Sequence, residues 1–247
     1  MPHPYSEADF GSCESAAIVL GELWRHLQPS SVVDVGCGWG AWLKAASQLG
    51  ASHVAGIDSY DVPRDQLLID KSAFHACDLE NGNCRKVFDK KTLFDLVISL
   101  EVAEHLSERR ADPFVSELCS LGDLILFSAA IPGQGGTNHV NEQWPMYWNA
   151  LFEKREYVCF DILRARIWDN SAIEWWYSQN VFLFARIGTV SYKILSDVAP
   201  PTSTPMPLVH PRMLAATVSL FEQIQNSTSW KITAPLRTIR RHWKSRL

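Results

Sequence analysis

Short apolar runs alternate with amphipathic stretches along most of the chain. Residues 13–27 carry apolar side chains near helical spacing, which predicts a helix before the first apolar run. Runs rich in β-branched and aromatic residues then predict seven strands, at 31–35, 53–57, 74–77, 94–99, 124–128, 157–162 and 181–185. Helices are predicted between them at 41–49, 108–121 and 145–154. This alternation is typical of a mainly parallel sheet with helices on both faces.

The composition changes after the last predicted strand. Segment 197–211 holds five of the 13 prolines, which favours an extended linker over regular structure. We therefore expect a catalytic domain over 1–190, with residues 1–30 as an N-terminal helical cap. A proline-rich linker is expected at 191–211, followed by a basic amphipathic helical tail at 212–247 with helices at 213–225 and 235–247.

Overall composition indicates an ordinary globular protein, because 47% of the 247 residues are hydrophobic and 20% are charged. No apolar stretch approaches the ~20 residues of a membrane span, and the N-terminal residues lack the basic and apolar regions of a signal peptide. None of the six cysteines forms a C-x-x-C pair, so reduced thiols are expected. These features favour a cytoplasmic location.

The strongest local signal is SVVDVGCGWGAW at residues 31–42. An apolar strand runs into Gly36, Gly38 and Gly40 and a helix follows, so backbone amides can approach a ligand closely. The spacing also fits a dinucleotide-binding loop, which leaves a nicotinamide enzyme and a purely structural turn as alternatives. Asp34 would meet a ligand ammonium and repel a pyrophosphate, and Asp58 ends the second strand at a distance suited to ribose hydroxyls.

Four motifs occur in order: Asp34-x-Gly36-x-Gly38-x-Gly40, Asp58, Asp78-Leu79 and FDLVISLEVAEHL at 94–106. Over residues 30–186 the chain closely resembles class I S-adenosylmethionine (AdoMet)-dependent methyltransferases. The resemblance implies a Rossmann-like α/β fold, with a seven-stranded mainly parallel sheet whose last strand is antiparallel. It also implies that Asp34 and the glycines hold the methionine portion, that Asp58 holds the ribose, and that Asp78 and Leu79 flank the adenine. The expected cofactor-binding set is Asp34, Gly36, Cys37, Gly38, Gly40, Asp58, Asp78, Leu79 and Ser99.

The segment after the fourth strand carries candidate chemistry for the acceptor. Helical continuation would place Glu101, Glu104 and His105 on one face at the carboxyl edge of the sheet. An alcohol is a poor nucleophile at neutral pH, so a general base or a divalent cation has to assist.

The E-x-x-E-H spelling of this segment is similar to metal-ligating segments of ubiquinone-pathway O-methyltransferases and small-RNA 2′-O-methyltransferases. That similarity implies a Mg²⁺ or Mn²⁺ site formed by Glu101, Glu104, His105 and His139. Methyltransferases with a similar spelling that work without metal give the alternative, in which Glu101 shapes the pocket wall and His105 faces the acceptor. A purely structural use is a third alternative.

A polar run with three glycines and a proline follows the fifth strand at residues 127–144 and predicts a mobile substrate lid. Within it His139 is the candidate general base, or a further metal ligand, and a helix-capping histidine is the alternative. The predicted catalytic residues are therefore His139, His105 and Glu101.

Two aromatic clusters lie near the predicted acceptor side. Trp144, Tyr147 and Trp148 fall at helical spacing, and the second cluster spans 175–177. Aromatic faces stack on sugar rings, but helices also bury aromatic side chains as core, and both uses are open here.

The lid, with 166–169 and 175–180, looks like bacterial methyltransferases of surface-polysaccharide and secondary-metabolite pathways. The expected function is thus O-methylation of a hydroxyl on a sugar or glycan intermediate, as in polysaccharide biosynthesis. The alternatives are N-methylation of an amino sugar or small amine, and a non-catalytic AdoMet-binding subunit of a glycan assembly complex.

The C-terminal tail is basic, with six lysines and arginines and no acid after Glu222, which leaves the rest of the chain acidic and without a nucleic-acid footprint. Leu236, Ile239, Trp243 and Leu247 recur at helical spacing, as in an interfacial helix attracted to anionic lipid. Residues 229–237 also resemble a short element near the ends of bacterial polysaccharide-pathway proteins. We expect peripheral contact with the inner face of the membrane. A solubilising tail and docking on a partner, such as a glycan assembly protein, are the alternatives.

Overall fold

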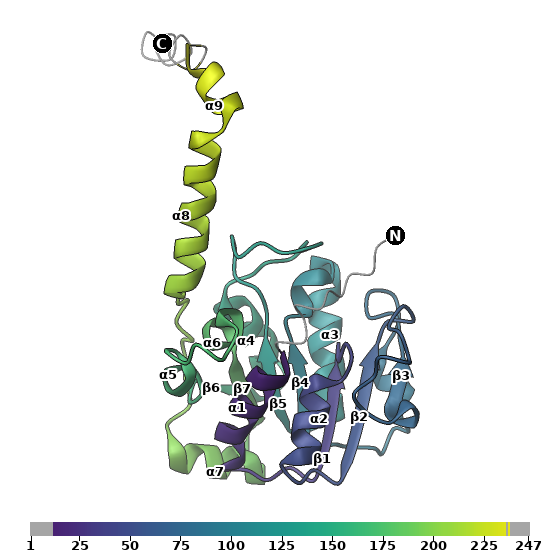
Figure 1. Ribbon diagram of the computed structural model, residues 1–247. Helices are drawn as coiled ribbons and strands as arrows, with labels where there is room; N and C mark the ends of the chain where they lie inside the picture. Colours follow the sequence, from purple (N-terminus) through teal and green to yellow (C-terminus); the bar gives the residue numbers. More distant parts are fainter. Residues whose placement is uncertain (1–11, 236, 238–247) are drawn as a thin grey trace. The chain divides into compact units, whose positions relative to one another are not determined.

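The computed structural model describes residues 12–235 and residue 237 (Figure 1). The chain divides into two compact units, one ending at Leu208 and the other beginning at Val209. The first unit contains the sheet and every residue of the candidate site.

A seven-stranded sheet organises the first unit, in the order β3-β2-β1-β4-β5-β7-β6. Its strands are β1 (Ser31–Val35), β2 (His53–Asp58), β3 (Phe74–Ala76), β4 (Leu96–Leu100), β5 (Leu124–Ser128), β6 (Tyr157–Phe160) and β7 (Phe182–Arg186). All neighbouring pairs are parallel except those of β7, which runs antiparallel to both β5 and β6. The predicted Rossmann-like fold with an antiparallel last strand is confirmed.

Helices cover both faces of the sheet. The first unit contains α1 (Ser12–Trp24), α2 (Ala41–Gln48), α3 (Glu108–Leu121), α4 (Pro145–Glu153), α5 (Arg164–Ile167), α6 (Trp175–Asn180) and α7 (Val190–Val198), with short 3-10 turns η2 (Lys71–Ala73), η3 (Cys84–Val87) and η4 (Ala103–His105). Alternate residues of a strand point to opposite faces. Accordingly Val32 packs in a core with α1, α2 and α7, whereas Val33 packs in a second core with α3 and α4.

The N-terminal helix differs from the expected cap. Ala16, Val19, Leu20 and Leu23 of α1 are fully buried in the same core as α2. Because its apolar side chains are buried in this core, α1 is part of the helix layer on one face of the sheet.

The expected linker is wrong at its start. Helix α7 occupies residues 190–198, and its Leu195 is fully buried in the core beside α1. The proline-rich segment that follows contains no helix or strand, but it is bonded to the domain. Thr202 N donates to Cys159 O at 2.8 Å, and Arg164 Nη1 donates to Met206 O at 3.0 Å. The proline pattern excluded regular structure without excluding docking, and the compact unit therefore continues to Leu208.

The second unit contains α8 (Pro211–Asn226) and α9 (Thr228–Ile232). Helix α8 confirms the helix predicted at 213–225. The helix predicted at 235–247, with its apolar stripe, lies almost wholly outside the described residues. No helix among the described residues has both the length and the apolar character required to cross a membrane.

Candidate active site

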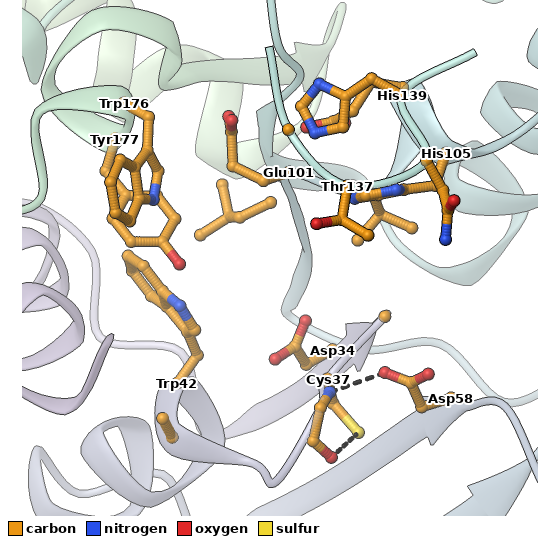
Figure 2. A pocket seen from close by; sticks show the side chains of 18 of the residues that line it. Asp34, Cys37, Trp42, Asp58, Glu101, His105, Thr137, His139, Trp176 and Tyr177 are labelled. Carbon is orange, nitrogen blue, oxygen red and sulfur yellow. Dashed lines mark hydrogen bonds between the residues drawn. The ribbon is translucent and has the colours of Figure 1, made fainter. Parts of the chain in front are cut away.

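A cavity of about 580 Å³ opens where the carboxyl ends of β1, β2 and β4 meet (Figure 2). It is lined by Asp34, Gly36, Cys37, Gly38, Trp39, Ala41, Trp42, Asp58, Leu68, Leu79, Leu100, Glu101, Val102, Glu104, His105, Leu106, Gln134, Gly135, Gly136, Thr137, Asn138, His139, Trp175, Trp176 and Tyr177. Four of these are acids, and no lysine or arginine in the described part of the chain joins them. The cavity therefore favours neutral or cationic ligand groups over anionic ones.

The glycine loop forms one wall of the cavity. Gly36, Gly38 and Gly40 all have positive φ, of 88°, 52° and 86°. A Cβ at Gly36 would lie 2.2 Å from Val102 Cγ2, so only glycine fits there without displacing Val102. Gly36 N donates to Ile57 O at 2.7 Å, and Gly38 N donates to Asp58 Oδ2 at 2.6 Å. The end of β2 thus fixes the loop.

Two buried carboxylates stand behind this loop. Oδ2 of Asp34 is buried and has no hydrogen-bond partner. Burial and the charge of Asp58 raise the pKa of Asp34 well above its usual value. Asp58 accepts from Gly38 N and from Ser59 N, at 2.6 Å each. A cationic group beside Asp34 would relieve the cost of a buried, unpartnered carboxylate.

The predicted cofactor-binding residues do not all reach the cavity. Asp34, Gly36, Cys37, Gly38, Asp58 and Leu79 line it, whereas Gly40, Asp78 and Ser99 are not among its lining residues. Gly40 instead N-caps α2, and Ser99 is fully buried within β4. Exposed Asp78 accepts from Asn81 Nδ2 and from the amides of Asn81 and Glu80, bonds that lower its pKa. Burial raises the pKa of the Cys37 thiol, so this cysteine lines the cavity in its neutral form.

From Glu101 onward, side-chain hydrogen bonds hold the cavity wall in place. Its φ is +56°, and η4 follows, so the predicted helical continuation that would align Glu101, Glu104 and His105 is wrong. Its carboxylate accepts from Gln134 Nε2 at 2.7 Å and from Asn180 Nδ2 at 3.1 Å. Burial raises the pKa of Glu101, although hydrogen bonds from Ser128, Asn180 and Gln134 oppose this. The amides of the lid and of α6 thereby fix the pocket wall.

Glu104 lies beneath the lid with no solvent exposure, and neither of its carboxylate oxygens has a hydrogen-bond partner. Its backbone carbonyl accepts from Val140 N at 2.9 Å and Asn141 N at 3.0 Å, which attaches the lid to η4. Burial and the charge of Glu101 raise the pKa of Glu104 well above its usual value. An unpartnered buried carboxylate is a favourable neighbour for a cation.

Two histidines meet over this carboxylate. The rings of His105 and His139 pack edge to face with centroids 4.8 Å apart, and burial, together with the charge of His139, lowers the pKa of His105. Glu104, His105 and His139 offer ligand atoms that all lie within 4.8 Å of one another. Glu101 is not part of this cluster, and its carboxylate accepts from the side-chain amides of Gln134 and Asn180. Three of the four predicted metal ligands therefore gather, and metal binding itself stays a prediction.

His139 has a partner that the sequence analysis missed. Its Nδ1 lies 2.9 Å from Oε1 of Glu142, three residues further along the lid. The same carboxylate accepts from Gly135 N at 2.8 Å and from Gly133 N at 2.7 Å. Burial raises the pKa of Glu142, but the hydrogen bonds from His139 and the two amides outweigh it and lower the pKa. The spacing of histidine and glutamate at i and i+3 was the available signal.

The comparisons with known proteins agree with this geometry. Residues 32–121 match the family model described as "Methyltransferase domain". Residues 32–121 therefore carry a methyltransferase domain. Over 101 residues it is 37% identical to the ribosomal protein L11 methyltransferase of Lactobacillus johnsonii, an alignment that covers 40% of this chain and 31% of that protein. The chain spans less than a third of the length of the curated relatives it matches.

Two solved structures share the fold of the methyltransferase domain. The amino pentose methyltransferase CalS10 from Micromonospora echinaspora, solved with bound SAM, has a TM-score of 0.52 at 15% identity and covers 75% of this chain and 99% of its own. The magnesium protoporphyrin IX methyltransferase from Synechocystis PCC 6803, solved with bound SAH, has a TM-score of 0.50 at 18% identity and covers 71% and 84%. At these identities the likeness concerns the fold.

Aromatic side chains of the methyltransferase domain divide between core and cavity. Trp148 is 2% exposed and packs against Phe127, and none of Trp144, Tyr147 and Trp148 lines the cavity. The second cluster does line it: Trp175, Trp176 and Tyr177. Figure 2 shows Trp176 and Tyr177 beside Trp42, whose ring centroid is 5.1 Å from that of Tyr177.

Proposed function

We propose that the chain is an AdoMet-dependent methyltransferase that methylates a hydroxyl of a sugar or glycan intermediate. The observation that carries the proposal is one cavity lined both by the glycine loop with Asp34 and by the His105–His139 pair under the lid. Bound AdoMet supplies an activated methyl group. The protein has to hold the acceptor in line with that group and remove the hydroxyl proton.

The glycine-loop end fits the cofactor. The unpartnered Oδ2 of Asp34 would accept from the ammonium of the methionine portion. Asp58 lines the cavity and would accept from ribose hydroxyls, and Leu79 would pack on the adenine. Asp78 is not assigned to the cofactor, since its side chain holds its own turn.

The opposite end fits a hydroxyl acceptor. In Figure 2 the two histidines lie across the cavity from Asp34 and Asp58, where a base would act on the acceptor. Trp175, Trp176 and Tyr177 supply faces on which a sugar ring stacks. The lack of lysine and arginine among the lining residues the structure describes disfavours phosphorylated or carboxylated acceptors. An amino pentose methyltransferase with the same fold supports a sugar-sized acceptor.

Metal-assisted deprotonation is the alternative route. The unpartnered carboxylate of Glu104 fits a divalent cation, with His105 and His139 as nitrogen ligands. Mg²⁺ or Mn²⁺ there would supply Lewis-acid activation of the hydroxyl. Loss of turnover in chelator, restored by either ion, is the result that supports this route, and turnover that ignores chelator contradicts it.

N-methylation of an amino sugar or small amine is the second candidate. The buried, unpartnered Glu104 favours it, because a carboxylate there would pair with an acceptor ammonium.

We place either reaction in the cytoplasm, where the six free cysteines stay reduced.

Calorimetry on the purified full chain tests the cofactor first. S-adenosylhomocysteine is expected to bind with one site per chain, and NAD is not; the reverse result contradicts the proposal. Binding without turnover on any sugar or amine acceptor supports the non-catalytic subunit instead.

A further inference from the structure

The carboxylate of Glu142 has three hydrogen-bond partners within the lid. Its two carboxylate oxygens accept from Gly133 N and Gly135 N near the start of the lid, and Oε1 also meets Nδ1 of His139. Its side chain is 19% exposed and that of His139 is 12% exposed. One carboxylate therefore ties the start of the lid to the histidine near its end.

This contact selects a tautomer of His139. A carboxylate accepts a hydrogen bond, so Nδ1 carries the proton and Nε2 keeps its lone pair. Carboxylate partners orient histidines in this way at many catalytic and metal sites. A Cβ at Gly136 would lie 2.2 Å from His139 Nε2, so the glycine at this position gives the ring its room.

We propose that Glu142 is a positioning residue that fixes the ring and tautomer of His139 so that Nε2 accepts the proton of the acceptor hydroxyl. The proposal rests on the function proposed above. The acceptor oxygen would take the methyl group of AdoMet, whose carbon–sulfur electron pair would stay on sulfur to give S-adenosylhomocysteine. The acceptor's oxygen–hydrogen bond would break as its proton moves to Nε2 of His139, and the carboxylate of Glu142 would stabilise the resulting imidazolium. Glu101, Glu104 and His105 also face His139, and Glu142 is the residue whose carboxylate hydrogen-bonds with its Nδ1.

The test uses Glu142→Gln in the full chain, because the glutamine oxygen can still accept from one of the two lid amides that Glu142 binds. Glu153→Gln is the matched control, since exposed Glu153 follows the lid in α4 and, among the described residues, its carboxylate accepts a hydrogen bond only from Asn149. With ¹⁵N-labelled histidine and S-adenosylhomocysteine added, the wild type and Glu153→Gln are expected to show His139 protonated at Nδ1. Glu142→Gln is expected to show a mixture of tautomers. Its kcat is expected to fall about 100-fold, with the S-adenosylhomocysteine dissociation constant unchanged.

Protonation of wild-type His139 at Nε2 would overturn the inference, and this result needs no variant to fold. Unchanged kcat in a folded Glu142→Gln would overturn it as well. Failure of the proposed function looks different, because S-adenosylhomocysteine then fails to bind the wild type while the tautomer remains at Nδ1.

A separate observation concerns the second unit. Leu214, Val218, Phe221 and Ile224 of α8 are 45–59% exposed and, at spacings of four, three and three, share one helix face. Helix α8 contains one arginine and one glutamate, and every charged residue after Glu222 is a lysine or an arginine. An apolar face next to uncompensated positive charge matches an anionic lipid surface.

We infer that the apolar face of α8 and the basic run after it bind an anionic membrane surface. At 16 residues the helix is about 24 Å long, and it would lie in the interface without spanning the bilayer. Contact of this kind would hold the enzyme near membrane-bound glycan intermediates.

Flotation of the full chain with phosphatidylcholine vesicles, with and without phosphatidylglycerol, tests this inference. Binding only to the anionic vesicles, lost at high salt, is expected. Leu214→Ser with Phe221→Ser is expected to weaken binding about tenfold or more. The control Gln223→Ser, on the opposite side of the same helix, is expected to bind normally. A wild type that ignores anionic vesicles at low salt overturns the inference. If the wild type is a dimer and Leu214→Ser with Phe221→Ser makes it a monomer, the apolar face of α8 belongs to an interface with a second copy of the chain instead.

Discussion

Backbone groups position the glycine-loop end of the cavity, whereas side chains from distant segments position the lid end. At the first end, three positive-φ glycines and the amides of Gly36 and Gly38 are fixed by the adjacent strand β2. At the second, Glu101 depends on Gln134 and Asn180, which are 33 and 79 positions away in the chain. A site that holds one cofactor can be built rigidly, while a site that admits and releases an acceptor is built on a lid and its side-chain contacts.

The largest expected effect on kcat comes from replacing the two histidines at the lid end. His139→Ala is expected to lower kcat by about 10² to 10⁴, because it removes the base, and His105→Ala is expected to lower it as well. The dissociation constant of S-adenosylhomocysteine should stay nearly unchanged, since both histidines lie at the lid end. Steady-state kinetics with calorimetry checks both values. Wild-type turnover in both variants returns the histidines to structural roles.

The two aromatic clusters sharpen the description of the lid end. Trp148→Ala should cost about 3 to 5 kcal/mol of unfolding free energy, because Trp148 is a buried core side chain. Trp176→Ala should unfold normally and raise KM for a sugar acceptor, because Trp176 is half-buried and lines the cavity. Denaturant titration and initial rates measure the two effects. A normal KM in folded Trp176→Ala would remove the second cluster from the acceptor wall.

Asp58 tests the glycine-loop end. Asp58→Ala removes a carboxylate that fixes Gly38 N and would accept ribose hydroxyls. We expect AdoMet affinity to fall by about 1.5 to 3 kcal/mol, the scale of hydrogen bonds to a charged group. Calorimetry measures this, and kcat at saturating AdoMet should be much less affected. A large loss of kcat with unchanged AdoMet affinity would contradict the assignment of cofactor binding to the glycine-loop end.

Asp34 gives the smallest expected effect and one that depends on pH. Burial and Asp58 raise the pKa of Asp34, so the folded chain keeps this proton to a higher pH than the unfolded chain does. Stability of the ligand-free protein therefore falls as pH rises above the unfolded value of about 3.9. Asp34→Asn should remove that loss and raise the melting temperature at neutral pH by a few degrees, about 2–4 °C per kcal/mol.

Binding of AdoMet to Asp34→Asn should be weaker despite the added stability, because the acceptor for the ligand ammonium has lost its charge. Thermal melts between pH 5 and 8, with and without S-adenosylhomocysteine, follow both effects. A variant that is less stable than the wild type at every pH would contradict the cost assigned to burying the charged carboxylate of Asp34.

The same difference between the two ends governs what could be predicted from the sequence. The bounds of β1, β5 and α3 agree with the predicted ones, and Asp34, Gly36, Gly38 and Asp58 line the cavity as expected. These features depend on local apolar patterns and on glycines, which the sequence displays directly.

The lid end depends on contacts that no local pattern displays. The positive φ of Glu101 ended the predicted helix, so Glu101, Glu104 and His105 do not lie along one helix face. Gln134 and Asn180 were not identified as site residues, because an amide has a role only once its distant partner is known. Likewise the docking of Thr202 and Met206 on the domain was hidden by a proline-rich composition typical of a free linker.

Methyl transfer from AdoMet labelled with a CD₃ group tests the central claim most directly. The full chain is incubated with a panel of neutral sugars and amino sugars, and the products are fragmented by mass spectrometry. The account predicts a CD₃ group on a hydroxyl oxygen of a sugar, with equimolar S-adenosylhomocysteine and loss of product in His139→Ala. Label on nitrogen alone, or product formation that is undiminished in His139→Ala, would contradict it.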